Sequence, residues 1–250
     1  MPKLNTEVDM RLILSAIALI LTSACTWQHP HIVVPAIPTP SEYVTREQAI
    51  QTANAYIGLQ WYASARHRMH GEDPDGQWVD TPDATAADSL GSAMWWKLGY
   101  NTGMPYKWGG FDTPQQFVQR LHQDTVVYAG DYASAAKVAG GDAAVSQYAA
   151  GIDCSGLVSR CWRLPRPYST RELGALCTPL PDFSALQPGD IALKPGVHVI
   201  LFVEWADAEH ASFYAIEAGG VPHWKCYRYR ISLNTLKRLG YTPQRYKNIR

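Results

Sequence analysis

The spacing of hydrophobic residues changes along the chain from a helical period to the period of strands. In the first part, apolar residues recur every three or four positions, as on one face of a helix. We predict helices that begin at Thr45, at Thr113-Pro114 and near Cys154, the first with the Thr-Arg-Glu-Gln form of a capping box. Their buried faces are defined by Ala49, Ile50, Ala53, Ile57 and Trp61, by Phe117, Val118 and Leu121, and by residues 154, 157, 158, 161 and 162.

From residue 190 onward, apolar and polar residues alternate with period two. The segments 190–194, 197–205, 212–218 and 225–231 are therefore predicted as strands, and Pro188-Gly189 and Pro195-Gly196 supply turns before the first two. Gly71–Asp83 and Gly130–Gly141 are predicted as loops. Helices followed by strands indicate an α+β domain with one core, in which N-terminal helices pack on an antiparallel β-sheet.

The N-terminal 44 residues differ from the rest. Residues 1–25 have the layout of a signal peptide, because an arginine precedes a short apolar run that ends in small residues. Thr22-Ser23-Ala24-Cys25 resembles a lipobox, in which Cys25 is lipidated after cleavage; a plain secreted protein and an uncleaved anchor are the alternatives. Residues 26–44 are rich in proline and predict an extended linker. The folded domain is therefore expected at 45–250.

Composition narrows the function classes. The chain is 46% hydrophobic and 18% charged, which is ordinary for a globular protein, and its 22 acidic and 22 basic residues give a formal net charge of zero. Nucleic-acid readers normally carry a basic excess, so we expect no nucleic-acid partner. His29 and His31 lack further ligands nearby, and no cysteine stands in CxxC or CxxH spacing, so we expect neither a metal nor another cofactor.

The five cysteines raise the question of a nucleophile. Cys161 lies two turns into an apolar helix face, where a buried thiol is inert. Cys154 lies at the start of that helix, where unpaired N–H groups and the helix dipole favour a thiolate; the alternative is a core or disulfide cysteine. Cys177 and Cys226 are either a disulfide or two free buried thiols, because sequence does not show their geometry.

A cysteine nucleophile needs a base, and His198 is the best placed of the eight histidines. It opens the most apolar strand directly after a Pro-Gly turn; a buried histidine with a purely structural role is the alternative. Glu217 lies near the end of the next strand. On an antiparallel neighbour it reaches the imidazole and holds its tautomer, as the third member of a catalytic triad does.

Three sequence pieces occur in a characteristic order. They are GMPYKWGG (103–110), GIDCSGLV (151–158), and LQPGDIAL followed by VHVILF (186–193 and 197–202). In this order they resemble the NlpC/P60 family of papain-like cysteine peptidases, exported bacterial enzymes that cut peptidoglycan stem peptides. The resemblance extends from about residue 103 to residue 218 and implies the papain-like fold of that family.

The resemblance also implies roles for individual residues. Cys154 matches the nucleophile, His198 the general base and acid, and Glu217 the third polar residue. Tyr106 matches the tyrosine whose hydroxyl holds the oxyanion beside the backbone N–H of Cys154. Three further residues of the matched motifs are expected to shape the site and bind substrate: Trp108, Asp153 and Ser155.

Two features depart from the family. First, 42 residues (111–152) separate Gly110 from Asp153, where the family has a far shorter link. Because both ends of this insert lie at the site, we expect it to form a lid or wall at the cleft. Second, Glu217 stands where the family usually has His, Asn or Gln.

We therefore expect an exported cysteine hydrolase that cuts peptidoglycan stem peptides through a thioester intermediate. An amidase or thioesterase of the same fold, acting on a lipid or a small N-acyl substrate, is the first alternative. A catalytically silent binding module of the cell envelope is the second. The expected partners are peptidoglycan peptides and, through lipidated Cys25, a membrane, which is the outer membrane in a cell with two membranes.

Overall fold

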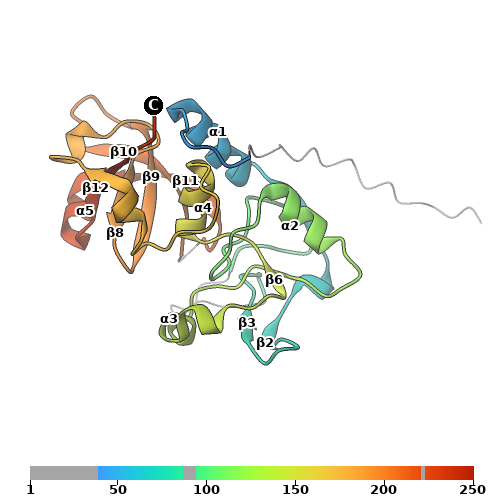
Figure 1. Ribbon diagram of the computed structural model, residues 1–250. Coiled ribbons are helices and arrows are strands. Elements are labelled where there is room, and N and C mark those ends of the chain that lie inside the picture. Colours follow the sequence, from blue (N-terminus) through green and yellow to red (C-terminus); the bar gives the residue numbers. More distant parts are fainter. Residues whose placement is uncertain (1–38, 87–93, 221–222) are drawn as a thin grey trace, which may run out of the picture. The chain divides into compact units, whose positions relative to one another are not determined.

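The structure is a computed structural model that describes residues 39–86, 94–220 and 223–250 (Figure 1). The expected signal peptide with Cys25, and most of the expected linker at 26–44, lie outside the described residues. Within the described ranges, no helix has the length and hydrophobicity needed to cross a bilayer.

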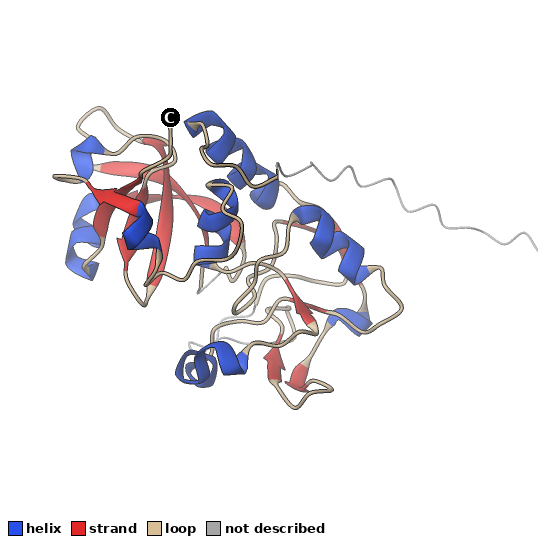
Figure 2. Ribbon diagram, viewed as in Figure 1, coloured by secondary structure: helices blue, strands red, loops and turns tan. Residues whose placement is uncertain are grey.

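Six strands form the main sheet, and every neighbouring pair in it is antiparallel (Figure 2). Their order across the sheet is β11-β10-β9-β8-β12-β7. Their bounds are β7 Cys177–Pro179, β8 Ile191–Lys194, β9 His198–Trp205, β10 Ser212–Ala218, β11 Cys226–Ser232 and β12 Thr242–Tyr246. The four predicted strands are β8 to β11, and they are confirmed. The period-two pattern missed β7 and β12, because both are short and contain proline.

Helices lie on both faces of this sheet. On one face, α4 (Cys154–Cys161) packs against β9 and β10, and α1 (Arg46–Ile57) packs against α4 and β11. On the other face lies α5 (Leu233–Leu239), which the sequence pattern missed. The alternation along β9 explains this arrangement: Val199, Leu201 and Val203 join the core under α4, whereas Ile200 and Phe202 join the core under α5. The predicted α+β class is confirmed.

Side-chain caps fix where the helices begin. At α1, Thr45 Oγ1 accepts from Gln48 N–H at 3.1 Å and Gln48 Oε1 accepts from Thr45 N–H at 3.0 Å, which is the predicted capping box. The same pair of bonds, between Thr113 and Gln116, caps α2 (Pro114–Leu121).

The first helix ends earlier than predicted. Gly58 is the C-cap of α1, so the expectation that Trp61 continues the helical face is wrong. Trp61 instead lies in β1 (Gln60–Ala63), which pairs with β4 (Gly99–Thr102). Its indole is fully buried against Phe117 of α2, so the hydrophobic signal was right although the element was not.

Both predicted loops contain regular structure, so those two predictions are wrong. Within Gly71–Asp83, β2 (His70–Glu72) and β3 (Trp78–Asp80) form a hairpin, whose turn is closed by Asp73 Oδ1 accepting from two backbone N–H groups. Within Gly130–Gly141 lies α3 (Ala135–Gly140), capped by Ser134. Neither segment carries an apolar period, because most of its buried side chains are polar or charged: Asp73, Thr81 and Asp83 in the first, and Asp131 and Lys137 in the second.

The remaining described elements are short. β5 (Tyr128–Ala129) and β6 (Ala149–Ala150) pair in parallel and tie the middle of the insert to its C-terminal end. Four 3-10 helices complete the set: η1 Ala65–His67, η2 Gly141–Ala144, η3 Leu173–Leu176 and η4 Phe183–Ala185.

The four cysteines of the described ranges are all free and buried. Cys177 lies in β7 and Cys226 lies in β11, at opposite edges of the six-stranded sheet. Strands stand about 4.8 Å apart, so these two residues are much farther apart than the ~7 Å between Cα atoms that a disulfide spans. Cys177 and Cys226 are therefore two free buried thiols and do not form a disulfide.

The packing of α4 on the sheet predicts a large stability effect at Leu157, which is fully buried. Leu157→Ala should lower the free energy of unfolding by about 2–5 kcal/mol, because it leaves a cavity between helix and sheet. The matched control is Leu98→Ala, since Leu98 is 51% exposed; its effect should stay within about 0.5 kcal/mol. Urea unfolding measures both, and equal losses in the two variants would contradict this packing.

Candidate active site

Cys154 is the first residue of α4, and the residues around it fix that helix end. Asp153 is the N-cap, and its Oδ1 accepts from Gly156 N–H at 2.6 Å and from Ser155 Oγ at 3.0 Å. A Cβ at Gly156 would lie 2.2 Å from the carbonyl oxygen of Gly110, so only glycine lets the helix approach the 103–110 segment. The N–H of Cys154 has no partner within its own helix and is available to an oxyanion.

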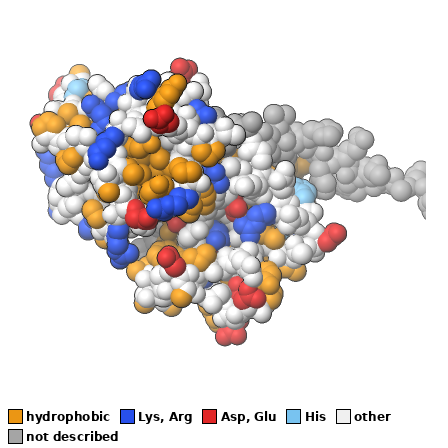
Figure 3. Space-filling model, viewed as in Figure 1, with side chains coloured by type: hydrophobic (Ala, Val, Ile, Leu, Met, Phe, Trp, Pro, Cys, Tyr) orange, Lys and Arg blue, Asp and Glu red, His pale blue; other side chains and the backbone are white. Residues whose placement is uncertain are grey.

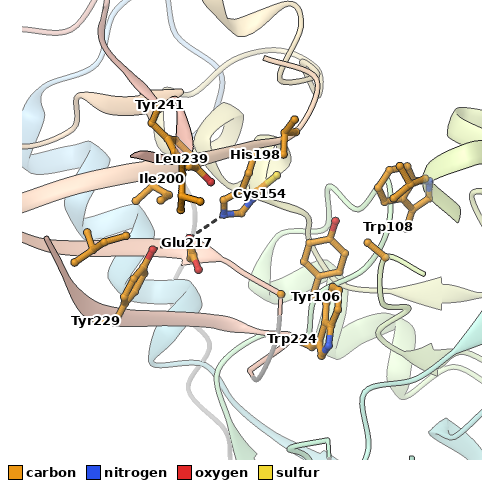
Figure 4. Close-up of a pocket in the computed structure, with 15 residues that line it drawn as sticks. Tyr106, Trp108, Cys154, His198, Ile200, Glu217, Trp224, Tyr229, Leu239 and Tyr241 are labelled. Atoms are coloured by element: carbon orange, nitrogen blue, oxygen red, sulfur yellow. Dashed lines mark hydrogen bonds and ion pairs between the residues drawn. The ribbon is translucent and has the colours of Figure 1, made fainter. Parts of the chain in front are cut away.

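His198 is the first residue of β9 and lies beside this cysteine (Figure 4). Ile216 on β10 pairs with Leu201 on β9, so the next residue, Glu217, lies on the same face as His198 and diagonally across from it. His198 Nε2 and Glu217 Oε2 are 2.8 Å apart. Because Glu217 occupies Nε2, the other ring nitrogen, Nδ1, is left for the thiol.

The imidazole of His198 carries a proton readily. Burial lowers the pKa of His198, but a thiolate at Cys154 and the hydrogen bond and charge of Glu217 outweigh burial, so this pKa lies well above its ordinary value. An imidazolium next to a cysteine in turn favours the thiolate, which is the nucleophilic form. The structure thus brings together the three residues that the sequence predicted for a triad.

Two tyrosines donate hydrogen bonds to the carboxylate of Glu217, and the sequence had not singled out either of them. Tyr227 Oη donates to Glu217 Oε1 at 2.6 Å, and Tyr229 Oη donates to Glu217 Oε2 at 2.9 Å. Burial raises the pKa of Glu217, but His198 and the two hydroxyls outweigh it, so the carboxyl has a lowered pKa and stays ionised. The alternation in 225–231 already put both tyrosines on one face of β11; the strand register, with Glu217 opposite Tyr227, was the missing information.

Tyr106 lines the same cleft as Cys154. It is 6% exposed, its N–H donates to the carbonyl of Trp224 at 2.8 Å, and its ring meets that indole edge-to-face at 5.3 Å. Burial, reinforced by negative charge at Cys154 and Asp153, raises the pKa of Tyr106 well above its ordinary value. The side chain therefore remains a hydroxyl donor, which is the state that an oxyanion requires.

The cleft at Cys154 has two halves of different character. The larger is a cavity of about 380 Å³, which we name the apolar half. Besides Cys154, His198 and Glu217, its lining includes Ile200, Trp224, Tyr229, Ile231, Leu239 and Tyr241. The smaller, of about 170 Å³, is the polar half. It is lined by Asp142, Asp153, Ser155, Ser169, Thr170 and Arg171, among others. Five residues border both halves: Tyr106, Trp108, Val138, Cys154 and Val197.

The predicted binding residues take different places in this cleft. Trp108 borders both halves, and its Nε1–H donates to the carbonyl of Gly141 at 2.9 Å. Asp153 and Ser155 line the polar half, but their side-chain oxygens bond each other and the first turn of α4. Their visible role is therefore to position Cys154.

The insert at 111–152 forms part of the cleft wall. Val138 of α3 borders both halves, and a buried ion pair anchors α3: Lys137 Nζ lies 2.7 Å from Asp131 Oδ2. Asp131 N–H donates to the carbonyl of Tyr106, and the carbonyl of Asp131 accepts from Trp108 N–H. The insert is thus attached to the segment that carries Tyr106.

Neither the cleft nor any other described part of the chain gathers three or more His, Cys, Asp or Glu side chains in a metal-binding arrangement. Comparison with known proteins gave no assignment: no protein-family model matches the chain, and no curated protein or solved structure matches it significantly.

The geometry predicts how the charge of Glu217 acts on His198. Glu217→Gln removes a negative charge that favours the imidazolium, so the pKa of His198 falls and the ring loses its proton at lower pH than in the wild type. NMR titration of the His198 ring measures this midpoint. The control is Glu204→Gln, which changes an exposed carboxylate on β9, the strand that carries His198. It should leave the titration midpoint of His198 unchanged. A midpoint unchanged by Glu217→Gln would show that the contact has no electrostatic role.

The tyrosine that faces Glu217 should stabilise the fold in a pH-dependent way. Tyr227→Phe removes one donor from a buried carboxylate and should lower the free energy of unfolding at pH 7 by about 1.5–3 kcal/mol. Because the pKa of Glu217 is lowered on folding, this contribution is complete above the ordinary pKa of Glu and disappears as the pH falls through the folded value. Urea unfolding at several pH values measures it, with Tyr100→Phe, an exposed site, as control. A pH-independent loss would contradict this account.

Proposed function

We propose that the protein is a cysteine hydrolase that opens an amide bond through a thioester. One observation carries the proposal: Cys154 stands at a helix N-terminus beside His198, whose Nε2 is held by the buried, ionised Glu217. A cysteine with only a packing role needs neither a base nor a group that orients the base.

The proposed reaction has two halves. The Cys154 thiolate attacks the amide carbonyl carbon, and the resulting oxyanion accepts hydrogen bonds from the Tyr106 hydroxyl and the Cys154 N–H. The C–N bond breaks as His198 gives its proton to the leaving amine, which leaves a thioester on Cys154. Water then attacks the thioester, His198 takes a proton from it, and the C–S bond breaks to release the carboxylic acid and the thiolate.

The proposed substrate and cellular place rest on the sequence resemblance. The ordered motifs around Tyr106, Cys154 and His198 support a papain-like catalytic domain of the NlpC/P60 type at 45–250, and that resemblance makes peptidoglycan stem peptides the first substrates to test. The proposed place is the cell envelope, after export by residues 1–25 and anchoring through Cys25.

Removal of the nucleophile tests the proposal. Purified protein should cleave an amide in peptidoglycan fragments, and Cys154→Ala should abolish the products, with a fall in rate of at least about 10³-fold, because no other group attacks the carbonyl. Cys161→Ala is the matched control: Cys161 is fully buried, and burial raises the pKa of its thiol far above the ordinary value. That variant should retain activity. Mass spectrometry of the fragments measures all three proteins.

Equal product patterns from the wild type and Cys154→Ala would contradict this function. Labelling with a thiol-reactive probe at neutral pH then separates an enzyme with another substrate from a silent binding module. Rapid labelling at Cys154, lost in Cys154→Ala, supports an enzyme with another substrate. A Cys154 as unreactive as Cys161 would mean that the cleft only binds.

A further inference from the structure

The apolar half of the cleft points to a particular kind of substrate. Its lining is mainly apolar or aromatic, and six of these side chains come from β9, β11, α5 and the loops beside them: Ile200, Trp224, Tyr229, Ile231, Leu239 and Tyr241. Its volume, about 380 Å³, lies within the range of cavities that enclose small ligands. A cavity with this lining favours an apolar ligand group. Burying a methylene against apolar side chains is favourable, whereas burying it against unpaired polar groups would also remove water from those groups at a cost.

The rim of the cleft is hydrophobic as well. Val138, Val197 and Leu239 border the cleft from the insert, the turn before β9 and the end of α5, and they are 58%, 61% and 45% exposed. On the side of the molecule seen in Figure 3, hydrophobic side chains gather over the part formed by β8, β9 and their surroundings. Exposed apolar groups that converge on a cavity mark a binding surface more often than scattered ones do.

The two halves of the cleft differ in the charged side chains that line them. Apart from Cys154, the charged side chains among the described residues that line the apolar half are His198 and Glu217, and these are bonded to each other. The polar half carries Asp142 and Arg171, and neither forms an ion pair with another residue in the described part of the chain. A substrate that fits both halves is therefore apolar on one side of Cys154 and charged on the other.

We propose that the apolar half binds the acyl chain of an N-acyl amide, whose charged amine part lies in the polar half. This inference rests on the proposed thioester chemistry and names its substrate class. The acyl group stays attached to Cys154 until water attacks, whereas the amine leaves first, so the larger cavity suits the acyl group. A γ-glutamyl donor, as in a stem peptide, would bring a carboxylate into a cavity whose described lining has no Lys or Arg, so we expect stem peptides to be cleaved more slowly than long-chain N-acyl amides.

The length of the acyl chain tests the proposal. In a series of Nα-acyl-L-lysines with acetyl, butanoyl, octanoyl and dodecanoyl groups, the charged part is constant and only the methylene count changes. We expect kcat/KM for release of lysine to rise at least tenfold from acetyl to octanoyl, because each buried methylene adds binding energy.

Two exposed apolar residues provide matched variants. Leu239→Glu places a charge at the rim of the apolar half and should lower kcat/KM for the octanoyl substrate at least tenfold. Val126→Glu makes a similar change at a residue that is 46% exposed and is absent from the lining of either half, so it should leave the chain-length preference intact.

Binding to Cys154→Ala separates failure of this proposal from failure of the proposed chemistry. Calorimetry with the same series should show affinity that rises with chain length, even if no amide in the series is cleaved. Chain-length-dependent binding keeps the acyl site and overturns the hydrolase if the wild type cleaves neither this series nor stem peptides and its Cys154 is as unreactive as Cys161. Cleavage that depends on Cys154 with equal rates for acetyl and octanoyl, or with stem peptides preferred to every N-acyl-lysine, keeps the hydrolase and overturns the acyl site.

Discussion

The site depends on an ionised carboxylate kept inside the protein. Removing the charge of Glu217 from water is costly, and the structure offsets that cost with three donors: His198 and two tyrosines on β11. The donors come from the strands on either side of β10, so the register of β9, β10 and β11 stabilises the charge of Glu217 and sets the direction of the imidazole beside Cys154. A neutral third member would need fewer donors but would attract the imidazolium less strongly.

The cleft combines two kinds of support. The sheet, with α4 packed on it, holds Cys154, His198 and Glu217 on regular elements, which fixes their geometry more rigidly than loops would. The opposite wall comes from the 103–110 segment and the insert, joined through backbone bonds to Asp131 and by the Trp108 indole to Gly141. The three residues of the proposed triad therefore share the rigid part, whereas the rest of the cleft lining comes partly from the strands and partly from the insert, the turns and α5.

Much of the site could be predicted from the sequence, because its signals are local. Helical period and capping residues placed Cys154 at a helix start, and alternation placed His198 and Glu217 on neighbouring strands. Long-range pairing was not visible. The roles of Tyr227 and Tyr229 depend on the strand register, and those of Leu239 and Tyr241 depend on α5, a helix too short to show a period. The helix α3, which borders the cleft through Val138, was missed because its alanine-rich sequence has no apolar stripe. The position of the insert at the cleft could be expected only because both ends of the insert lie there.

The central claim is that the thiol of Cys154 carries the acyl group during turnover. Acid quenching during hydrolysis, followed by proteolysis and mass spectrometry, tests it directly. The account predicts that the peptide with Cys154 gains the mass of the acyl group less one hydrogen, and that hydroxylamine removes this adduct, as expected of a thioester. Hydrolysis at full rate with no adduct on that peptide, or with the adduct on another residue, would contradict it.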